Sequence, residues 1–195
     1  MKYIAMAALL LCMSAAAVSA QPTSVKMTFS GTSGPSTINL LYSDASFTDE
    51  DNFAGNSSLG SFTVRNIRAL PNSGSTPPSN CSGPNQFYAV ELHGGSVMRF
   101  QDNSLLFLNL TEGRDCINTV SGVADCVLTF QITGGTGRFK NASGTLTMTE
   151  TALPVLADAS GNAALYAATG DLTGTISGVA TDDHRDQEGQ HDDAQ

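Results

Sequence analysis

One stretch, residues 126–150 (CVLTFQITGGTGRFKNASGTLTMTE), constrains the fold of this chain more than any other. Its two arms alternate apolar with mostly polar residues, and strand side chains point to opposite faces with a period of two. Between the arms, Gly134-Gly135-Thr136-Gly137 predicts a sharp reversal, because glycine reaches positive φ without a Cβ clash. The stretch therefore predicts a β-hairpin with one face in a core. The residues expected on that face are Cys126, Leu128, Phe130, Ile132, Ala142, Gly144, Leu146 and Met148.

Phe139 follows the glycine turn at once and breaks parity with the second arm. We expect its ring to fold back as a plug over one end of the core. The glycines do not form a nucleotide site, because Lys140 occupies the position of the third glycine of the dinucleotide fingerprint. A phosphate loop would also need Gly-Lys-Ser/Thr, which is absent from the turn.

The hairpin also resembles a known motif. Residues 132–139 (ITGGTGRF), followed by Ala142 and Gly144, resemble the GGTG-x-F-x-x-A-x-G hairpin of dirigent proteins and the matching hairpin of allene oxide cyclases. Those families share an eight-stranded antiparallel barrel, so the resemblance implies that fold. The motif is structural, and no functional residue of either family is carried over to this chain. Its turn residues here are Gly134, Gly135, Gly137, Phe139 and Gly144.

The rest of the chain repeats short alternating segments separated by glycine- and proline-rich turns, without helical periodicity after the first residues. This pattern predicts an all-β sandwich or barrel. Glycines on inward faces, at positions 144, 174 and 178, favour a single antiparallel barrel of about eight strands, closed or nearly closed. Beside the hairpin, the expected strands are residues 25–29, 38–42, 59–70, 86–93, 97–100, 104–111, 163–168 and 172–179. The expected turns and loops are residues 31–36, 43–58, 71–80 and 154–162.

Residues 1–20 have the features of a signal peptide: Lys2, a short apolar stretch, and small residues before Gln21. We therefore expect export to a periplasmic or extracellular space after cleavage between Ala20 and Gln21. The apolar stretch is too short for a membrane span. The barrel domain is expected at residues 21–181.

Residues 182–195 carry six acids, one arginine and two histidines without an apolar run. This composition predicts a disordered acidic tail. The alternative is metal scavenging by His184 and His191, which a solvated tail does not require.

The chain is acidic, with 18 acidic and 9 basic residues and a formal net charge of −9, and loss of Lys2 with the signal makes it more negative. Binding to nucleic acid phosphates needs basic patches, so this partner is excluded, and an anionic membrane surface is disfavoured. No cofactor is expected. The expected partner is a small apolar ligand, and self-association is left open.

Three cysteines follow the signal segment: Cys81, Cys116 and Cys126. An exported chain meets oxidising conditions, so we expect a disulfide. The preferred pair is Cys116 with Cys126, which would clamp the loop at 117–125; the alternative joins Cys81 to either of them. One thiol is left over, and the spacing lacks a Cys-x-x-Cys pattern, so no metal site is predicted.

Glu150, Glu91 and His93 are the weak catalytic candidates. Glu150 continues the inward parity of the second arm, and a carboxylate in an apolar barrel mouth would have a raised pKa suited to acid–base work. Charged residues are seldom fully buried. The favoured interpretation therefore places Glu91 and His93 on the outer face and Glu150 in water at a strand end. Surface ion pairs are expected for Arg65, Arg68, Arg99, Arg114 and Arg138.

Two functional classes follow from this sequence. The favoured class is a non-catalytic exported barrel that binds a small ligand or serves as a structural or interaction module. The alternative is a cyclase or isomerase of the allene oxide cyclase or dirigent kind, acting on an apolar small molecule in the barrel. An open apolar pocket with Glu150, Glu91 or His93 pointing inward would favour the enzyme, and a filled core with polar groups only on the outer faces would exclude it.

Overall fold

The computed structural model describes residues 21–38, 47–71 and 76–180. These residues form one antiparallel sheet and two short 3₁₀ helices, Ser79–Cys81 and Gly137–Phe139. Within these ranges there is no helix of the length and apolarity needed to cross a membrane. The strands are β1 Thr23–Pro35, β2 Phe47–Ser57, β3 Gly60–Leu70, β4 Gln86–Val90, β5 His93–Phe100, β6 Leu105–Asn118, β7 Ala124–Gly135, β8 Ser143–Ala157 and β9 Ala163–Ser177.

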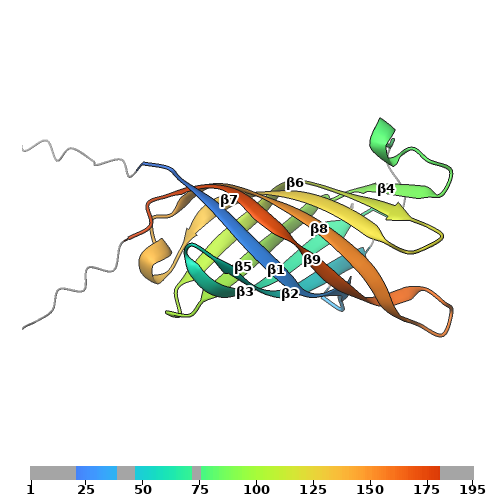
Figure 1. Cartoon of the computed structure of the whole chain (residues 1–195), viewed down its shortest axis with the longest axis horizontal. Helices are drawn as coiled ribbons and strands as arrows, with labels where there is room; N and C mark the ends of the chain where they lie inside the picture. The colour runs from blue at the N-terminus through green and yellow to red at the C-terminus, as the bar shows by residue number, and fades with distance from the viewer. Residues whose placement is uncertain (1–20, 39–46, 72–75, 181–195) are drawn as a thin grey trace, which may run out of the picture.

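Eight of the strands close into a barrel (Figure 1). The order β6-β5-β3-β2-β1-β9-β8-β7 returns to its start because β6 also pairs with β7. The ninth strand, β4, pairs with the far part of β6 beyond the segment that β5 covers. The predicted antiparallel barrel of about eight strands is therefore confirmed. Closure removes most of the unpaired strand edges that an open sheet would expose.

The two ends of the barrel differ (Figure 1). The end that we call the closed end carries the start of β1, the end of β9 and the β7–β8 connection. The other end, the open end, carries β4, the β6–β7 turn and the β8–β9 hairpin, which project from it. Beyond Ala152, β8 pairs only with β9, so this hairpin continues as a two-stranded ribbon.

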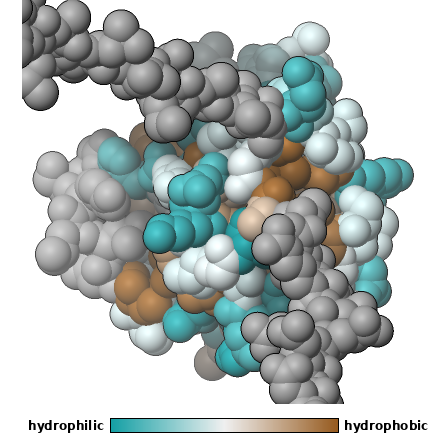
Figure 2. All heavy atoms as spheres, turned by 90° about the vertical axis from the view of Figure 1, so that its left-hand side faces the viewer, coloured by the Kyte–Doolittle hydropathy of each residue, from teal (hydrophilic) through white to brown (hydrophobic). Residues whose placement is uncertain are grey.

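Phe139 fills the closed end. Its side chain is fully buried, and its ring centroid lies 4.7 Å from that of Phe100. The Arg138 guanidinium lies over both rings, 4.7 Å from Phe139 and 5.1 Å from Phe100. Gly137 has φ 56°, and a Cβ there would collide with the Ser104 side chain. Figure 2 looks onto this end, where hydrophobic residues show between hydrophilic ones.

The hairpin of residues 126–150 lies as its parity predicts. Every inward residue of its first arm is buried, and so are Leu146 and Met148 of the second. Gly144 and Gly174 face each other's strands with φ 141° and 157°, and a Cβ at either would collide with the opposing carbonyl oxygen. Only glycine therefore lets β8 and β9 come this close while they coil around the barrel.

Several predicted boundaries are wrong. Residues 43–58 were expected as a loop, but β2 runs from Phe47 to Ser57. Its inward positions include acids, so the apolar alternation that marks a strand is missing. The expected turn at 31–36 belongs mostly to β1, part of the expected loop at 154–162 belongs to β8, and β9 is one strand where two were expected. The strand predicted at 38–42, the signal peptide and the acidic tail lie almost wholly outside the described residues.

The preferred disulfide, Cys116 with Cys126, is also wrong. The structure joins Cys81 to Cys116, with Cα atoms 5.7 Å apart, and leaves Cys126 free and buried. In the β6–β7 register Cys126 lies opposite Asp115, so both point into the barrel and Cys116 points outward. Two cysteines on opposite faces of a sheet cannot bridge, and the outer Cys116 meets Cys81 instead.

Peptide mapping should confirm this pairing. Proteolysis on the amino side of aspartate cuts before Asp115 and Asp125 and so separates the three cysteines. Without reduction, the Cys81 and Cys116 peptides should stay joined, and the Cys126 peptide should carry the alkylating label only when the protein was unfolded first. A cross-link between the Cys116 and Cys126 peptides would contradict the structure.

Candidate functional site

The barrel interior has an apolar half near the closed end and a polar half near the open end. Five carboxyl groups surround one guanidinium in the polar half, and these carboxyl groups come from four different parts of the sheet. We call this group the interior polar cluster. Its members are Asp49 and Asp51 of β2, Arg68 of β3, Glu91 at the β4–β5 junction, Asp115 of β6 and Glu150 of β8.

Arg68 is the centre of this cluster and is only 2% exposed. Its Nη1 lies 3.2 Å from Glu91 Oε1 and 3.5 Å from Asp115 Oδ1. Its Nη2 lies 3.4 Å from Asp51 Oδ1 and donates a hydrogen bond to Ser33 Oγ at the same distance. A buried charge is tolerated when it is paired and hydrogen-bonded, and Arg68 meets both conditions. Three carboxyl groups are thus committed to one cation.

A hydrogen-bond network holds Asp51 in place from the other side. Ser33 Oγ donates to Asp51 Oδ1 at 2.6 Å, and Asn66 Nδ2 donates to Asp51 Oδ2 at 2.7 Å. Asn66 in turn accepts a hydrogen bond from Ser96 Oγ at 2.8 Å. These side chains come from β1, β2, β3 and β5, so the network fixes the position of Asp51 relative to four strands.

Glu91 lies at the junction between β4 and β5, and its side chain is buried inside the barrel. The Glu91 N–H donates to the Gly113 carbonyl and the Leu92 N–H donates to the Ala69 carbonyl, both at 2.8 Å. A Cβ at Gly113 would lie 2.5 Å from the Glu91 Cβ, so this glycine makes room for the glutamate. Burial raises the pKa of Glu91 well above its usual range, although Arg68 opposes the shift. The favoured placement of Glu91 on the outer face is wrong.

Glu150 also lies inside, 3% exposed, so its favoured placement in water is wrong as well. Neither of its carboxyl oxygens has a hydrogen-bond partner. Burial raises the pKa of Glu150 to about 8, with repulsion from Asp51, Asp115 and Asp49 adding to the shift and Arg68 opposing it. Glu150 is therefore mostly protonated at neutral pH.

Asp49 has a raised pKa of about 6, because of burial first and then the neighbouring acids, against the opposing charge of Arg68. In the described part of the chain no side chain donates a hydrogen bond to its carboxyl group. Unlike Glu91 and Glu150, Asp49 lines a cavity. It was missed at the sequence level because it fell in the stretch predicted as a loop.

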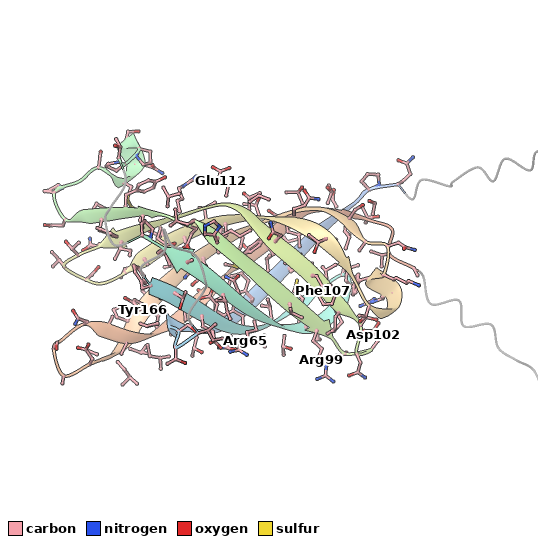
Figure 3. The ribbon with its side chains drawn as sticks, turned by 180° about the vertical axis from the view of Figure 1, so that it is seen from behind. Arg65, Arg99, Asp102, Phe107, Glu112 and Tyr166 are labelled. Carbon is pink, nitrogen blue, oxygen red and sulfur yellow. A yellow bond between two sulfur atoms is a disulfide. The ribbon has the colours of Figure 1, made fainter. Side chains whose placement is uncertain are left out.

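A cavity of about 220 Å³ opens from the interior polar cluster toward the open end. Asp49, Arg68, Asp115 and Cys126 form its inner wall, and burial raises the pKa of the Cys126 thiol well above its usual range, so the thiol is neutral. Tyr166 lies at this end of the barrel (Figure 3). We call this space the inner cavity. Its remaining lining residues are Ser33, Pro35, Phe47, Ile117, Ala124, Ala152, Ala163 and Tyr166.

A second, wider hollow of about 660 Å³ lies between the β6–β7 turn and the β8–β9 hairpin, and we call it the outer groove. Val120 and Leu156 line it and are 76% and 61% exposed. Ile117, Ala163 and Tyr166 line both hollows, so the outer groove and the inner cavity lie next to each other.

The structure brings together two of the three catalytic candidates. Glu91 and Glu150 belong to the interior polar cluster, whereas His93 is half-buried on β5 and does not line the inner cavity. The surface pairing predicted for the arginines holds for Arg65, whose Nε lies 2.8 Å from Glu50 Oε1, but is wrong for Arg68. Extending the inward parity of Phe62 and Val64 along β3 would have found Arg68.

Among residues 21–38, 47–71 and 76–180, no three His, Cys, Asp or Glu side chains are arranged to hold a metal ion. Neither a scan against protein-family models nor a search of curated proteins finds a match for this chain. The fold and the site thus define a closed antiparallel β-barrel with a buried polar cluster beneath one open end.

Proposed function

We propose that this protein binds a small molecule at the open end of the barrel. The observation that carries the proposal is the inner cavity, which is lined by the buried Arg68 and the half-buried Asp49. Barrels of about eight strands can hold one small ligand, and ligand sites combine apolar walls with a few placed polar groups. The volume of about 220 Å³ suits one end of a ligand, with the outer groove taking the rest. The disulfide fits an exported protein, and export through residues 1–20 stays a prediction.

Native mass spectrometry of the purified protein tests this proposal. The wild-type protein should retain a small molecule, and an Ala163→Trp variant should not, because residue 163 lines both hollows. Val97→Trp is the matched control, since Val97 is exposed on β5 away from both hollows. A wild-type protein free of any small molecule, or an Ala163→Trp variant that still carries one, would contradict the proposal.

A second candidate is the cyclase or isomerase that the hairpin resemblance implies. It is favoured by two inward carboxyl groups with separated pKa values, about 6 for Asp49 and about 8 for Glu150. Near neutral pH such a pair supplies a proton acceptor and a proton donor in one site.

The same purified proteins distinguish the two candidates. An isomerase would carry product in the wild type and substrate in a Glu150→Gln variant, and these compounds have equal mass but separate by chromatography. A binding protein would carry one and the same compound in both. Identical retention times would therefore exclude the isomerase.

A further inference from the structure

The inner cavity offers a ligand an uncommitted carboxyl group but no uncommitted cation. Both terminal nitrogens of Arg68 are taken up by Glu91, Asp115, Asp51 and Ser33. The remaining nitrogen, Nε, is buried and has no hydrogen-bond partner among the described residues. The carboxyl group of Asp49, in contrast, lines the cavity with no donor from the described residues. A bound anion would therefore meet carboxyl groups and no free positive charge.

Glu150 supplies an independent observation that points the same way. Its strand neighbour Ala152 and its cross-strand partner Cys126 both line the inner cavity, so Glu150 lies just beneath the cavity floor. It is 3% exposed, and both of its oxygens lack partners. A buried polar group without a hydrogen bond is unfavourable and calls for an explanation. Because Glu150 does not itself line the cavity, a cation bound there would favour the ionised form of Glu150 through its charge and not by a direct hydrogen bond.

The outer groove differs from the inner cavity because none of its described lining residues is charged. Its lining combines apolar residues, among them Val120, Val155 and Leu156, with uncharged polar residues such as Asn118 and Asn162. Exposed apolar side chains gathered around a hollow are typical of a ligand or interaction site. A ligand that spans both hollows therefore needs an apolar part outside and a donor-rich, positively charged group inside.

We infer, on the basis of the proposed function, that the ligand is a small amphiphilic amine. Its ammonium group lies in the inner cavity beside Asp49, above Glu150, and its alkyl or aryl part lies along the outer groove past Tyr166. The ammonium group supplies three hydrogen-bond donors and the positive charge that the cluster lacks. A bound ammonium ion would favour the ionised forms of Asp49 and Glu150, and the resulting negative charge would be complementary to the cation.

Binding of such a cation should release protons. The ammonium charge favours the ionised forms of Asp49 and Glu150, so affinity should rise as pH rises through about 6 and again toward about 8. An alkylammonium ion keeps its own charge across this range, as a lysine does. The other titratable groups that face the site are Asp51 of β2, Arg68 of β3, Glu91 at the β4–β5 junction, Asp115 of β6, Cys126 of β7 and Tyr166 of β9.

Calorimetric titration of the full chain with octylamine, octanol and octanoate tests this inference, because the three probes differ only at the head group. Octylamine should bind at least about tenfold more tightly than the other two, with proton release and a higher affinity at about pH 8 than at about pH 6. Asp49→Asn should weaken octylamine about tenfold and leave octanol unchanged. Glu112→Gln, which removes an exposed carboxyl on the outer face of β6, should change neither (Figure 3).

The outcomes separate this inference from the proposed function. If octanol or octanoate binds as tightly as octylamine, and Ala163→Trp abolishes that binding, the cavity binds small molecules but the amine assignment is overturned. An octylamine affinity that does not rise with pH, or that survives Asp49→Asn, overturns the assignment as well. If none of the probes binds and native mass spectrometry finds no retained molecule, both proposals are overturned.

Discussion

Replacing Arg68 by methionine should lower the free energy of unfolding by about 3–5 kcal/mol at neutral pH. Methionine is apolar and shorter, so Asp51, Glu91 and Asp115 would stay buried without the cation that lies 3.2–3.5 Å from each of them. The loss comes less from the ion pairs themselves than from leaving uncompensated carboxyl groups in the interior. Urea denaturation followed by circular dichroism measures the effect.

Arg65→Met is the matched control. Arg65 lies on the same strand, but its side chain is 55% exposed and its Glu50 partner is at the surface, so the change should cost no more than about 1 kcal/mol. The deficit of Arg68→Met should shrink at acidic pH, where protonation discharges the buried carboxyl groups. Arg68→Lys keeps the positive charge, so it can be measured if the methionine variant fails to fold. If the Arg68 and Arg65 variants lose equal stability, Arg68 does not hold the cluster together.

The apolar half of the barrel could be predicted from the sequence because its chemistry follows the period of a strand. From residue 126 to residue 149, inward positions are apolar or glycine and outward positions are mostly polar, with glycines at the turn. The barrel followed from the short alternating segments along the chain and from the inward glycines at positions 144, 174 and 178. The resemblance to dirigent proteins and allene oxide cyclases implied the same fold, and membership of those families stays a prediction.

The polar half could not be predicted in the same way, because its inward residues are charged. Asp49 and Asp51 removed the apolar alternation of β2, so that strand was taken for a loop. Arg68 was assigned to the surface because the arginines are scattered along the sequence and were expected to pair with surface acids. A search of the sequence for apolar inward faces therefore does not find this site.

Glu91 was misplaced for a different reason, a change of parity within one stretch. In β4 the buried residue is Ala89, so Glu91 shares its inward face, whereas in β5 the buried residues include Ser96 and Met98. The odd-numbered positions point inward before the junction and the even-numbered positions after it. A single alternation over residues 86–93 could not describe both strands, and the shift itself carries Glu91 into the cluster.

Between about pH 5 and about pH 8, the barrel should lose stability as pH rises, by up to about 1.4 kcal/mol per pH unit for each carboxyl group with a raised pKa. The pKa of Glu150 is about 8 in the folded protein, whereas the unfolded chain has the usual glutamate value of 4.5. In this range the folded state therefore keeps a proton that the unfolded chain has released. Raising the pH therefore favours unfolding until Glu150 ionises in the folded state too. Asp49 adds to the slope below about pH 6. Urea midpoints measured across this range test the sign and the slope.

The Glu150→Gln variant tests whether Glu150 causes this change of stability with pH. Glutamine has nearly the same shape as glutamate and no charge at any pH. Between about pH 6 and pH 8, the slope of the free energy of unfolding against pH should therefore be smaller in the variant by about the contribution of one proton. At the upper end of this range the variant should be more stable than the wild type. Glu112→Gln, at an exposed position of β6, should leave the slope unchanged. A wild-type barrel whose stability is flat or rises over this interval would show that Glu150 is ionised in the folded state. A slope that survives Glu150→Gln undiminished would assign the proton to Glu91, whose pKa is also raised by burial.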